Sequence, residues 1–183
     1  KGKAVLTDER NKLVTQTGPE TPMGNLFRRY WIPFLLSGEV AENGGPPVRV
    51  KLLSERLLAF RDSEGRLGLI EEFCAHRRVS LWFGRNEEGG IRCPYHGWKF
   101  DVEGTCLEIP SEPPESRFCE EVSLTSYPCV ERGGIVWAYM GPTEEQPPPP
   151  AFEWAAVPAD QRYHSKRLEE CNYLQALEGG IDS

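Results

Sequence analysis

Histidine is scarce in this chain, with only three among 183 residues. Long apolar runs are also missing: the longest, Tyr30 to Leu36, is far shorter than the ~20 residues of a membrane helix. The first residues have no apolar core of the kind that a secretory signal needs. The formal charge of -7 disfavours binding to nucleic-acid phosphates. We therefore expect a cytoplasmic protein with no membrane span and no nucleic-acid partner.

Six cysteines contrast with the three histidines. An even number of cysteines is compatible with disulfides, but nothing else in the sequence indicates secretion. Metal binding or simple burial is then the better interpretation of these thiols. Four cysteines have no histidine nearby in the sequence and are expected to be buried small apolar residues: Cys106, Cys119, Cys129 and Cys171.

Short runs rich in Val, Leu and Phe, separated by Gly, Pro, Asp and Ser, predict β-structure over most of the chain. A hairpin is expected to turn at Glu103-Gly104. A short helix is expected to begin at Thr21-Pro22 and to end at Pro33. The pattern favours a mainly β protein, a small antiparallel sandwich or barrel. The expected strands are 48–53, 56–60, 67–71, 98–101, 105–109, 123–127 and 135–140.

A run of prolines, residues 147–150, predicts a stiff and extended connector. Beyond it, Leu174 and Leu177 predict the start of a helix that breaks at Gly179-Gly180. The 33 residues that follow the prolines are too few for a second domain. We expect four parts: an N-terminal helical segment at 1–39, a β domain at 40–142, a linker at 143–158 and a C-terminal segment at 159–183.

The distinctive motif is Cys74-Ala75-His76, followed after sixteen residues by Cys93-Pro94-Tyr95-His96. It contains two of the three histidines, each two or three positions beyond a cysteine. Each half therefore offers one thiolate and one imidazole in a short loop. The remaining histidine, His164, lies in a polar stretch and is expected to be an ordinary surface residue.

Two thiolates and two imidazoles suit more than one kind of site. Buried cysteines beside satisfied histidines are one alternative, and a structural zinc ion is another. Zinc sites usually place a cysteine pair before a histidine pair, whereas here the two residue types alternate. The alternation favours a two-iron cluster in which one iron has two thiolates and the other has two imidazoles, the ligation of a Rieske centre.

Residues 72–100, EFCAHRRVSLWFGRNEEGGIRCPYHGWKF, resemble the Rieske domain of bacterial ring-hydroxylating oxygenases. The opening TGPETPMGNLFRRYWIPFLLSGEV is similar to the phthalate dioxygenase branch of that family. The resemblance implies a Rieske [2Fe-2S] antiparallel β-sandwich domain. It also implies that Cys74 and Cys93 bind the first iron, and that His76 and His96 bind the second.

The first loop departs from the family pattern at one position. Many members have Gly after the Arg of this loop, whereas here Arg77 is followed by Arg78. The loop backbone is therefore expected to differ locally. Three aromatic residues near the motif are expected to shield it from water: Trp82, Phe83 and Trp98.

The C-terminal segment CNYLQALEGGIDS resembles the entry to the α+β catalytic domain of these oxygenases. By that resemblance, Asp182 matches an aspartate that bridges two metal sites, with His96 of the neighbouring subunit as its partner. The catalytic mononuclear Fe(II) needs two histidines and one carboxylate. Only His164 remains after the cluster, so we expect this to be the front part of a longer subunit.

The resemblance implies the terminal oxygenase component of a Rieske non-haem iron dioxygenase. Its electrons would come from an NAD(P)H-dependent reductase, and its substrates would be O2 and an aromatic compound, such as an aromatic carboxylate like phthalate. Electron transfer between subunits implies a homotrimer or stacked trimers. Two alternatives stay open: an O-demethylase of a methoxylated aromatic, and a non-enzymatic Rieske ferredoxin that only carries electrons. The C-terminal segment argues against the carrier.

Overall fold

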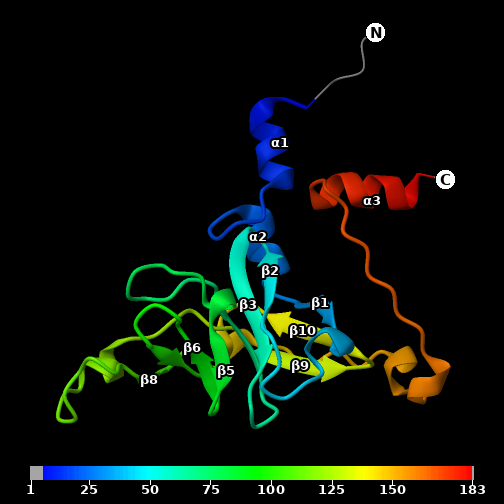
Figure 1. Cartoon of the computed structure of the whole chain (residues 1–183). Helices are drawn as coiled ribbons and strands as arrows, with labels where there is room; N and C mark the ends of the chain where they lie inside the picture. The colour runs from blue at the N-terminus through cyan, green and yellow to red at the C-terminus, as the bar shows by residue number, and fades with distance from the viewer. Residues whose placement is uncertain (1–5, 183) are drawn as a thin grey trace.

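The computed structural model describes residues 6–182 as a mainly β structure with antiparallel sheets and a few short helices (Figure 1). Helices α1 (Asp8–Thr15) and α2 (Pro22–Phe27) come first, and α3 (Tyr173–Ile181) comes last. The strands are β1 (Trp31–Leu36), β2 (Val48–Leu52), β3 (Glu55–Arg61), β4 (Leu67–Glu71), β5 (Arg85–Glu87), β6 (Gly90–Arg92), β7 (Lys99–Phe100), β8 (Cys106–Glu108), β9 (Cys129–Arg132) and β10 (Ile135–Tyr139). The expectation of a mainly β, antiparallel fold is confirmed.

The sheet β2-β3-β4 has apolar clusters on both of its faces. Side chains alternate along a strand, so successive residues of β3 point to opposite faces. Leu58 and Phe60 join the cluster shared with the sheet β5-β6-β7-β8. Leu57 and Ala59 join the cluster shared with the sheet β1-β10-β9. The continuous apolar run of β3 therefore reflects burial on both faces.

The hairpin predicted around Glu103-Gly104 is present, because β7 pairs with β8 in antiparallel register. The expected strand at 123–127 is wrong. That segment makes only isolated bridges, Ile70 with Ser126 and Thr105 with Ser123. The partner of β10 is instead β9, which pairs from Arg132 back to Cys129. The two-residue turn at Gly133-Gly134 pairs β10 with the residues directly before the turn, which form β9.

The start of the β-structure also differs from expectation. Helix α2 has Thr21 as its N-cap, as predicted, but it ends at Phe27. Pro33 lies inside β1, which pairs with β10 and has a register shift between Pro33 and Leu35. Proline is tolerated there because β1 is an edge strand, where an amide donor is not needed on the solvent side. Helix α1 was not anticipated from the sequence.

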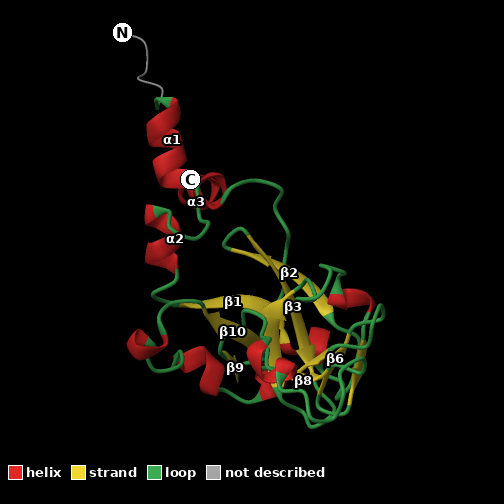
Figure 2. Ribbon diagram, turned by 90° about the vertical axis from the view of Figure 1, so that its left-hand side faces the viewer, coloured by secondary structure: helices red, strands yellow, loops and turns green. Residues whose placement is uncertain are grey.

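Helix α3 continues through Gly179-Gly180, so the predicted break at these glycines is wrong. Asn172 caps its first turn by accepting a hydrogen bond from the Gln175 amide, 3.1 Å away. The Tyr173 ring meets Phe27 edge-on at 4.8 Å between ring centroids. Figures 1 and 2 accordingly show α3 beside α1 and α2, away from β6 and β8.

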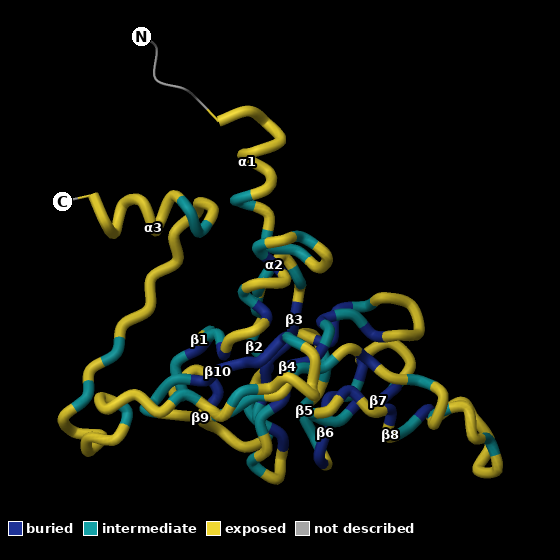
Figure 3. The backbone as a smooth tube through the Cα atoms, turned by 180° about the vertical axis from the view of Figure 1, so that it is seen from behind, coloured by how far each residue is buried: buried dark blue, intermediate teal, exposed yellow. Residues whose placement is uncertain are grey.

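The proline-rich segment contacts the β-structure. The indole N–H of Trp31 donates to the Pro147 carbonyl at 2.9 Å. The Phe152 ring lies 5.7 Å from that of Trp137 on β10. In contrast, residues 166–172 run along an exposed path to α3 (Figure 3). Within residues 6–182, no helix has the length and apolarity that a membrane crossing requires.

Candidate metal centre

Two loops of equal size carry the Cys–His motif. The first is flanked by an antiparallel bridge between Phe73 and Ser80, and the second by the pairing of Arg92 with Lys99. Each cysteine immediately follows the first flanking residue of its loop. The two thiols therefore occupy the same position in two similar hairpins.

Hydrogen bonds around the cysteines repeat between the loops. The Cys74 amide donates to the Val79 carbonyl at 2.9 Å, and the Cys93 amide donates to the Trp98 carbonyl at 2.8 Å. The Cys74 carbonyl accepts from the Arg78 amide at 2.9 Å, and the Cys93 carbonyl accepts from the Gly97 amide at 3.1 Å. These bonds hold each cysteine at the base of its loop.

The thiols are buried and the imidazoles are exposed. Cys74 and Cys93 expose only 1% and 4% of their surface. They belong to the apolar cluster of Leu58, Ile91 and Phe100. The side chains of His76 and His96 lie outside this cluster on the surface. The arrangement thus has an inner end made of sulfur and an outer end made of imidazole nitrogen.

Like residues lie beside like across the two loops. Cys74 and Cys93 share one apolar cluster, and Cys93 is close enough to raise the pKa of the Cys74 thiol. The His76 and His96 rings are 4.6 Å apart between centroids. Among the described residues, no three His, Cys, Asp or Glu side chains converge as they would around a single metal ion. A thiol pair next to an imidazole pair suits a cluster in which one iron has two thiolates and the other has two imidazoles.

The pKa values of the thiol end and the imidazole end shift in opposite directions. Burial raises the pKa of the Cys74 thiol to about 11, and the neighbouring Cys93 adds to the rise, while backbone N–H groups of His76 and Arg77 oppose it. Desolvation, together with the charges of His96 and Arg77, lowers the pKa of His76. A metal ligand must be a neutral imidazole or a thiolate. The lowered His76 pKa favours the neutral ring.

Aromatic side chains cover the imidazoles unevenly. The Trp98 ring stacks on His76 at 4.8 Å with an angle of 7° between the planes. Tyr95 lies 3.8 Å from the His96 ring. Trp82 and Phe83, expected to shield the site, are exposed and lie against the guanidinium of Arg49 instead. Tyr95 was not singled out from the sequence, although its place beside His96 in the motif was visible there.

A buried carboxylate anchors the first loop. Glu72 precedes the loop, exposes 2% of its side chain and accepts from the Ser80 hydroxyl at 2.6 Å. Arg49 and Arg56 donate to the same carboxylate at 2.9 and 3.0 Å. Burial alone would raise the Glu72 pKa, but the hydrogen bonds from Ser80, Arg49 and Arg56 outweigh it and lower that pKa.

A guanidinium anchors the second loop. Arg92 exposes 14% of its side chain and donates to Glu87 at 2.6 Å, to Glu108 at 2.8 Å and to the Gly97 carbonyl at 2.9 Å. Hydrogen bonding to Glu108 and Glu87 raises the pKa of Arg92. Neither Glu72 nor Arg92 was identified from the sequence, because only the fold brings their partners together.

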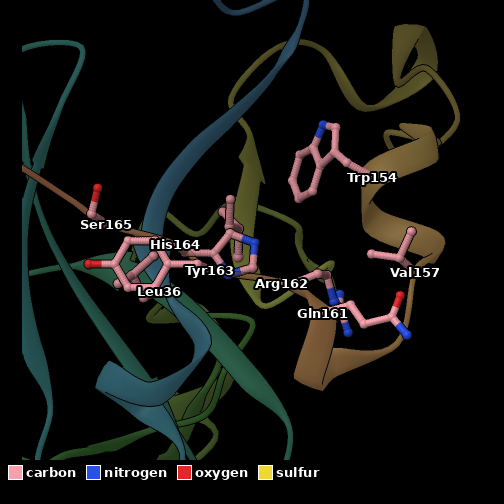
Figure 4. A pocket seen from close by; sticks show the side chains of 9 residues that line it. Leu36, Trp154, Val157, Gln161, Arg162, Tyr163, His164 and Ser165 are labelled. Atoms are coloured by element: carbon pink, nitrogen blue, oxygen red, sulfur yellow. The ribbon is translucent and has the colours of Figure 1, made fainter.

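The remaining predicted site residues lie elsewhere. Asp182 follows α3, where its amide donates to the Glu178 carbonyl at 3.0 Å. Figure 1 shows α3 away from β6, the strand that leads into the second loop. His164 is half-buried rather than on the surface, and lines a cavity of about 430 Å³ with Trp154 and Arg162 (Figure 4).

The other cysteines differ from the single expectation made for them. Cys106 is buried, Cys119 and Cys129 are half-buried, and Cys171 is exposed. The prediction that Cys171 is buried is therefore wrong, because its segment runs along the surface before α3.

The sequence matches the Rieske [2Fe-2S] domain family over residues 30–128. The chain belongs to this family. Its fold is mainly β, as expected, and the family description supports a [2Fe-2S] cluster as the cofactor. The matched range includes both loops and every strand except β9 and β10.

Curated relatives extend the similarity beyond the matched domain. The oxygenase subunit of phthalate 4,5-dioxygenase from Pseudomonas putida is 48% identical over 181 residues, which is 98% of this chain and 41% of the relative. The oxygenase subunit of 5,5'-dehydrodivanillate O-demethylase from Sphingobium sp. is 37% identical over 183 residues, 97% of this chain and 42% of the relative. The chain thus spans about two fifths of these relatives.

The fold is also similar to that of a solved oxygenase structure. Dicamba monooxygenase with non-heme iron and dicamba superposes with a TM-score of 0.63 at 26% identity, covering 73% of this chain and 40% of that one. The relatives are oxygenase subunits, whose names denote oxidoreductases.

Proposed function

We propose that this chain is the cluster-bearing part of the terminal oxygenase component of a Rieske non-haem iron dioxygenase. Cys74 and Cys93 would hold one iron, and His76 and His96 the other. The observation that carries this assignment is the pairing of buried thiols on one side and exposed imidazoles on the other. A [2Fe-2S] cluster bound there supplies a one-electron redox centre at raised potential.

Different groups of the protein would hold the sulfur end and the imidazole end of such a centre. The apolar cluster around Cys74 and Cys93 excludes water from the sulfur end. Backbone N–H groups of His76 and Arg77 oppose the rise in the pKa of the Cys74 thiol and so favour its thiolate. Trp98 holds the His76 ring in one orientation by stacking. The imidazole end is the exposed end and is therefore the side on which electron partners would meet the protein.

The complete enzyme would contain a mononuclear Fe(II) held by residues outside these 183. The length of the curated relatives supports this, since the chain spans 41% of the phthalate dioxygenase subunit. Asp182 would accept a hydrogen bond from His96 of a neighbouring subunit and so lie between the two metal sites. Its exposed place at the end of α3 suits a contact between subunits. A homotrimer or stacked trimers would provide such contacts repeatedly.

The proposed partners follow from the relatives. Electrons would come from an NAD(P)H-dependent reductase in the cytoplasm, and the substrates would be O2 and an aromatic carboxylate. The name of the relative at 48% identity supports the carboxylate. Within the chain, we propose parts at 1–39, 40–142, 143–158 and 159–183, the second being the cluster-bearing domain.

O-demethylation of a methoxylated aromatic is the second candidate. The dehydrodivanillate O-demethylase subunit, at 37% identity, favours it. Turnover of the full-length protein with phthalate and with a methoxybenzoate separates the two: release of formaldehyde accompanies demethylation, whereas dioxygenation releases none. A non-enzymatic carrier is disfavoured because the similarity to oxygenase subunits extends through nearly the whole chain, including α3.

Visible absorption and electron paramagnetic resonance of the full-length protein test the metal assignment. A red-brown protein with two irons and two sulfides per Rieske domain is expected. A colourless preparation that contains zinc would overturn the cluster assignment. The Asp182→Asn variant should keep both metals while electron transfer between them slows, which stopped-flow absorption measures. Normal transfer in that variant would refute the bridging role.

A further inference from the structure

A second pair of thiols lies behind the loops. Cys106 lies on β8 and Cys119 lies in a short 3-10 turn at Phe118–Glu121. The Cys119 S–H donates to the Cys106 sulfur at a sulfur–sulfur distance of 2.7 Å. A disulfide needs about 2.05 Å between its sulfurs. The sulfurs are therefore already adjacent, and bond formation requires only a small further approach.

The two thiols differ in their access to solvent. Cys106 is buried in the apolar cluster that also contains Cys74 and Cys93. Cys119 is half-buried and packs against the edge of that cluster. The residues before it are at the surface, where Arg117 exposes 81% of its side chain. A small oxidant therefore reaches Cys119 first, with Cys106 behind it.

We propose that Cys106 and Cys119 form a reversible dithiol–disulfide site that reacts with low-molecular-weight disulfides. The Cys119 thiolate attacks the reagent disulfide, which forms a mixed disulfide and releases one thiol. The Cys106 sulfur then displaces the second reagent thiol, and the protein disulfide forms. Two protein thiols are oxidised, one reagent disulfide is reduced to two thiols, and both protons end on those thiols.

The position of this pair connects it to the candidate metal centre. Phe118, next to Cys119, meets Trp98 edge-on at 5.9 Å between ring centroids. Trp98 in turn stacks on His76. A bond from Cys119 to β8 would tie the 3-10 turn to the sheet and hold Phe118 against Trp98. Bond formation is independent of the proposed function, whereas its effect at His76 rests on it.

The test uses the full-length protein with its cluster, treated with oxidised glutathione. Non-reducing peptide mapping should find Cys106 linked to Cys119, and reduction should restore both thiols. Because the bond restrains the turn, tryptic cleavage after Arg117 should slow by about fivefold or more in the oxidised protein. The Cys119→Ser variant should cleave at one rate with or without oxidised glutathione.

Cys171 provides the matched control, because it is exposed and belongs to another part of the chain. The Cys171→Ser variant should form the Cys106–Cys119 link as the unmodified protein does. Three outcomes would overturn the proposal: a mixed disulfide that persists on Cys119, no linked peptide, or linkage of Cys74 to Cys93 in its place. Absorption of the cluster, recorded in parallel, reports separately on the proposed function.

Discussion

The two loops of the candidate metal centre share a backbone and differ in charge. Both hold a cysteine by the same pair of hydrogen bonds, from the same position in an eight-residue hairpin. The first is anchored by a buried anion, Glu72, with Arg49 and Arg56 around it. The second is anchored by a largely buried cation, Arg92, between carboxylates.

The inverted charges show that the backbone frame does not depend on one particular ion pair. In each loop, the buried group satisfies several donors or acceptors at once, which compensates for its loss of water. Glu72 is more deeply buried than any carboxylate that contacts Arg92. The first loop therefore depends more strongly on a single side chain than the second does.

The loops also differ at one strained position. Gly97 has a φ of 78°, and the equivalent residue of the first loop, Arg78, has a φ of 57°. Glycine adopts this left-handed region without cost, whereas a side chain there is strained. Arg78 offsets the strain through an ion pair with Glu71 and a contact over the Phe73 ring. Arg78, which stands where many family members have Gly, thus adopts a backbone conformation that favours glycine.

Removal of a metal ligand from either loop should have the largest effect. Replacement of Cys74, His76, Cys93 or His96 by Ala should abolish the cluster, since one of the two irons would lose one of its two protein ligands. Visible absorption with iron and sulfide analysis measures this. The Cys171→Ser variant should keep full cluster content. A cluster retained after loss of one loop's ligands would contradict the equal role of the two loops.

Loss of the buried anion should be the next largest effect. Glu72→Gln should lower the free energy of unfolding by about 2 kcal/mol, because it removes the charged acceptor shared by Ser80 and two arginines. Glu87→Gln, which removes one partner of the Arg92 anchor, should cost less than about 1 kcal/mol, since Glu87 is more exposed than Glu72 and Arg92 keeps Glu108. Denaturant unfolding of the cluster-loaded protein measures both. Equal losses of stability in the two variants would contradict the stronger dependence of the first loop on a single side chain.

The left-handed position predicts a clear loss of stability for Gly97→Ala and almost none for Arg78→Gly. Gly97→Ala should destabilise the protein by about 1–2 kcal/mol, because of its φ and because the new Cβ would lie 3.0 Å from Pro110 Cγ. Arg78→Gly should change stability by less than about 0.5 kcal/mol, since relief of strain offsets the lost contacts. Thermal unfolding followed by circular dichroism measures both variants. A large loss in Arg78→Gly would show that the contacts outweigh the strain.

The smallest effect concerns pH at the second anchor. The hydrogen bond from Arg92 lowers the pKa of Glu108, so the carboxylate is more acidic in the folded protein. Its stabilisation is present above the unfolded pKa of about 4.3 and is lost as pH falls below it. Glu108→Gln should therefore reduce stability at pH 7 by less than about 1 kcal/mol and make a smaller difference near pH 3. Unfolding titrations at both pH values test this, and an equal loss at both would contradict it.

The local sequence pattern was sufficient to predict much of the fold. The runs of β2, β3 and β4 were predictable from apolar residues between turn signals, and the turn at Glu103-Gly104 from its glycine. Pro33 was predicted to end a helix, but it lies in β1, where the edge position tolerates proline. The pairing across the turn at Gly133-Gly134 makes β9, and not 123–127, the strand beside β10. Continuation of α3 through two glycines likewise was not visible in composition.

For the candidate site, the sequence by itself determined which residue types alternate at which spacing, and hence the chemistry of the two loops. Only the tertiary structure decided that thiols meet thiols inside and imidazoles meet imidazoles outside. Only it brought Glu72 and Arg92 to their partners and Cys119 to Cys106. The reason is that ligand spacing is a local property of a loop, whereas burial and charge compensation come from strands far apart in the chain.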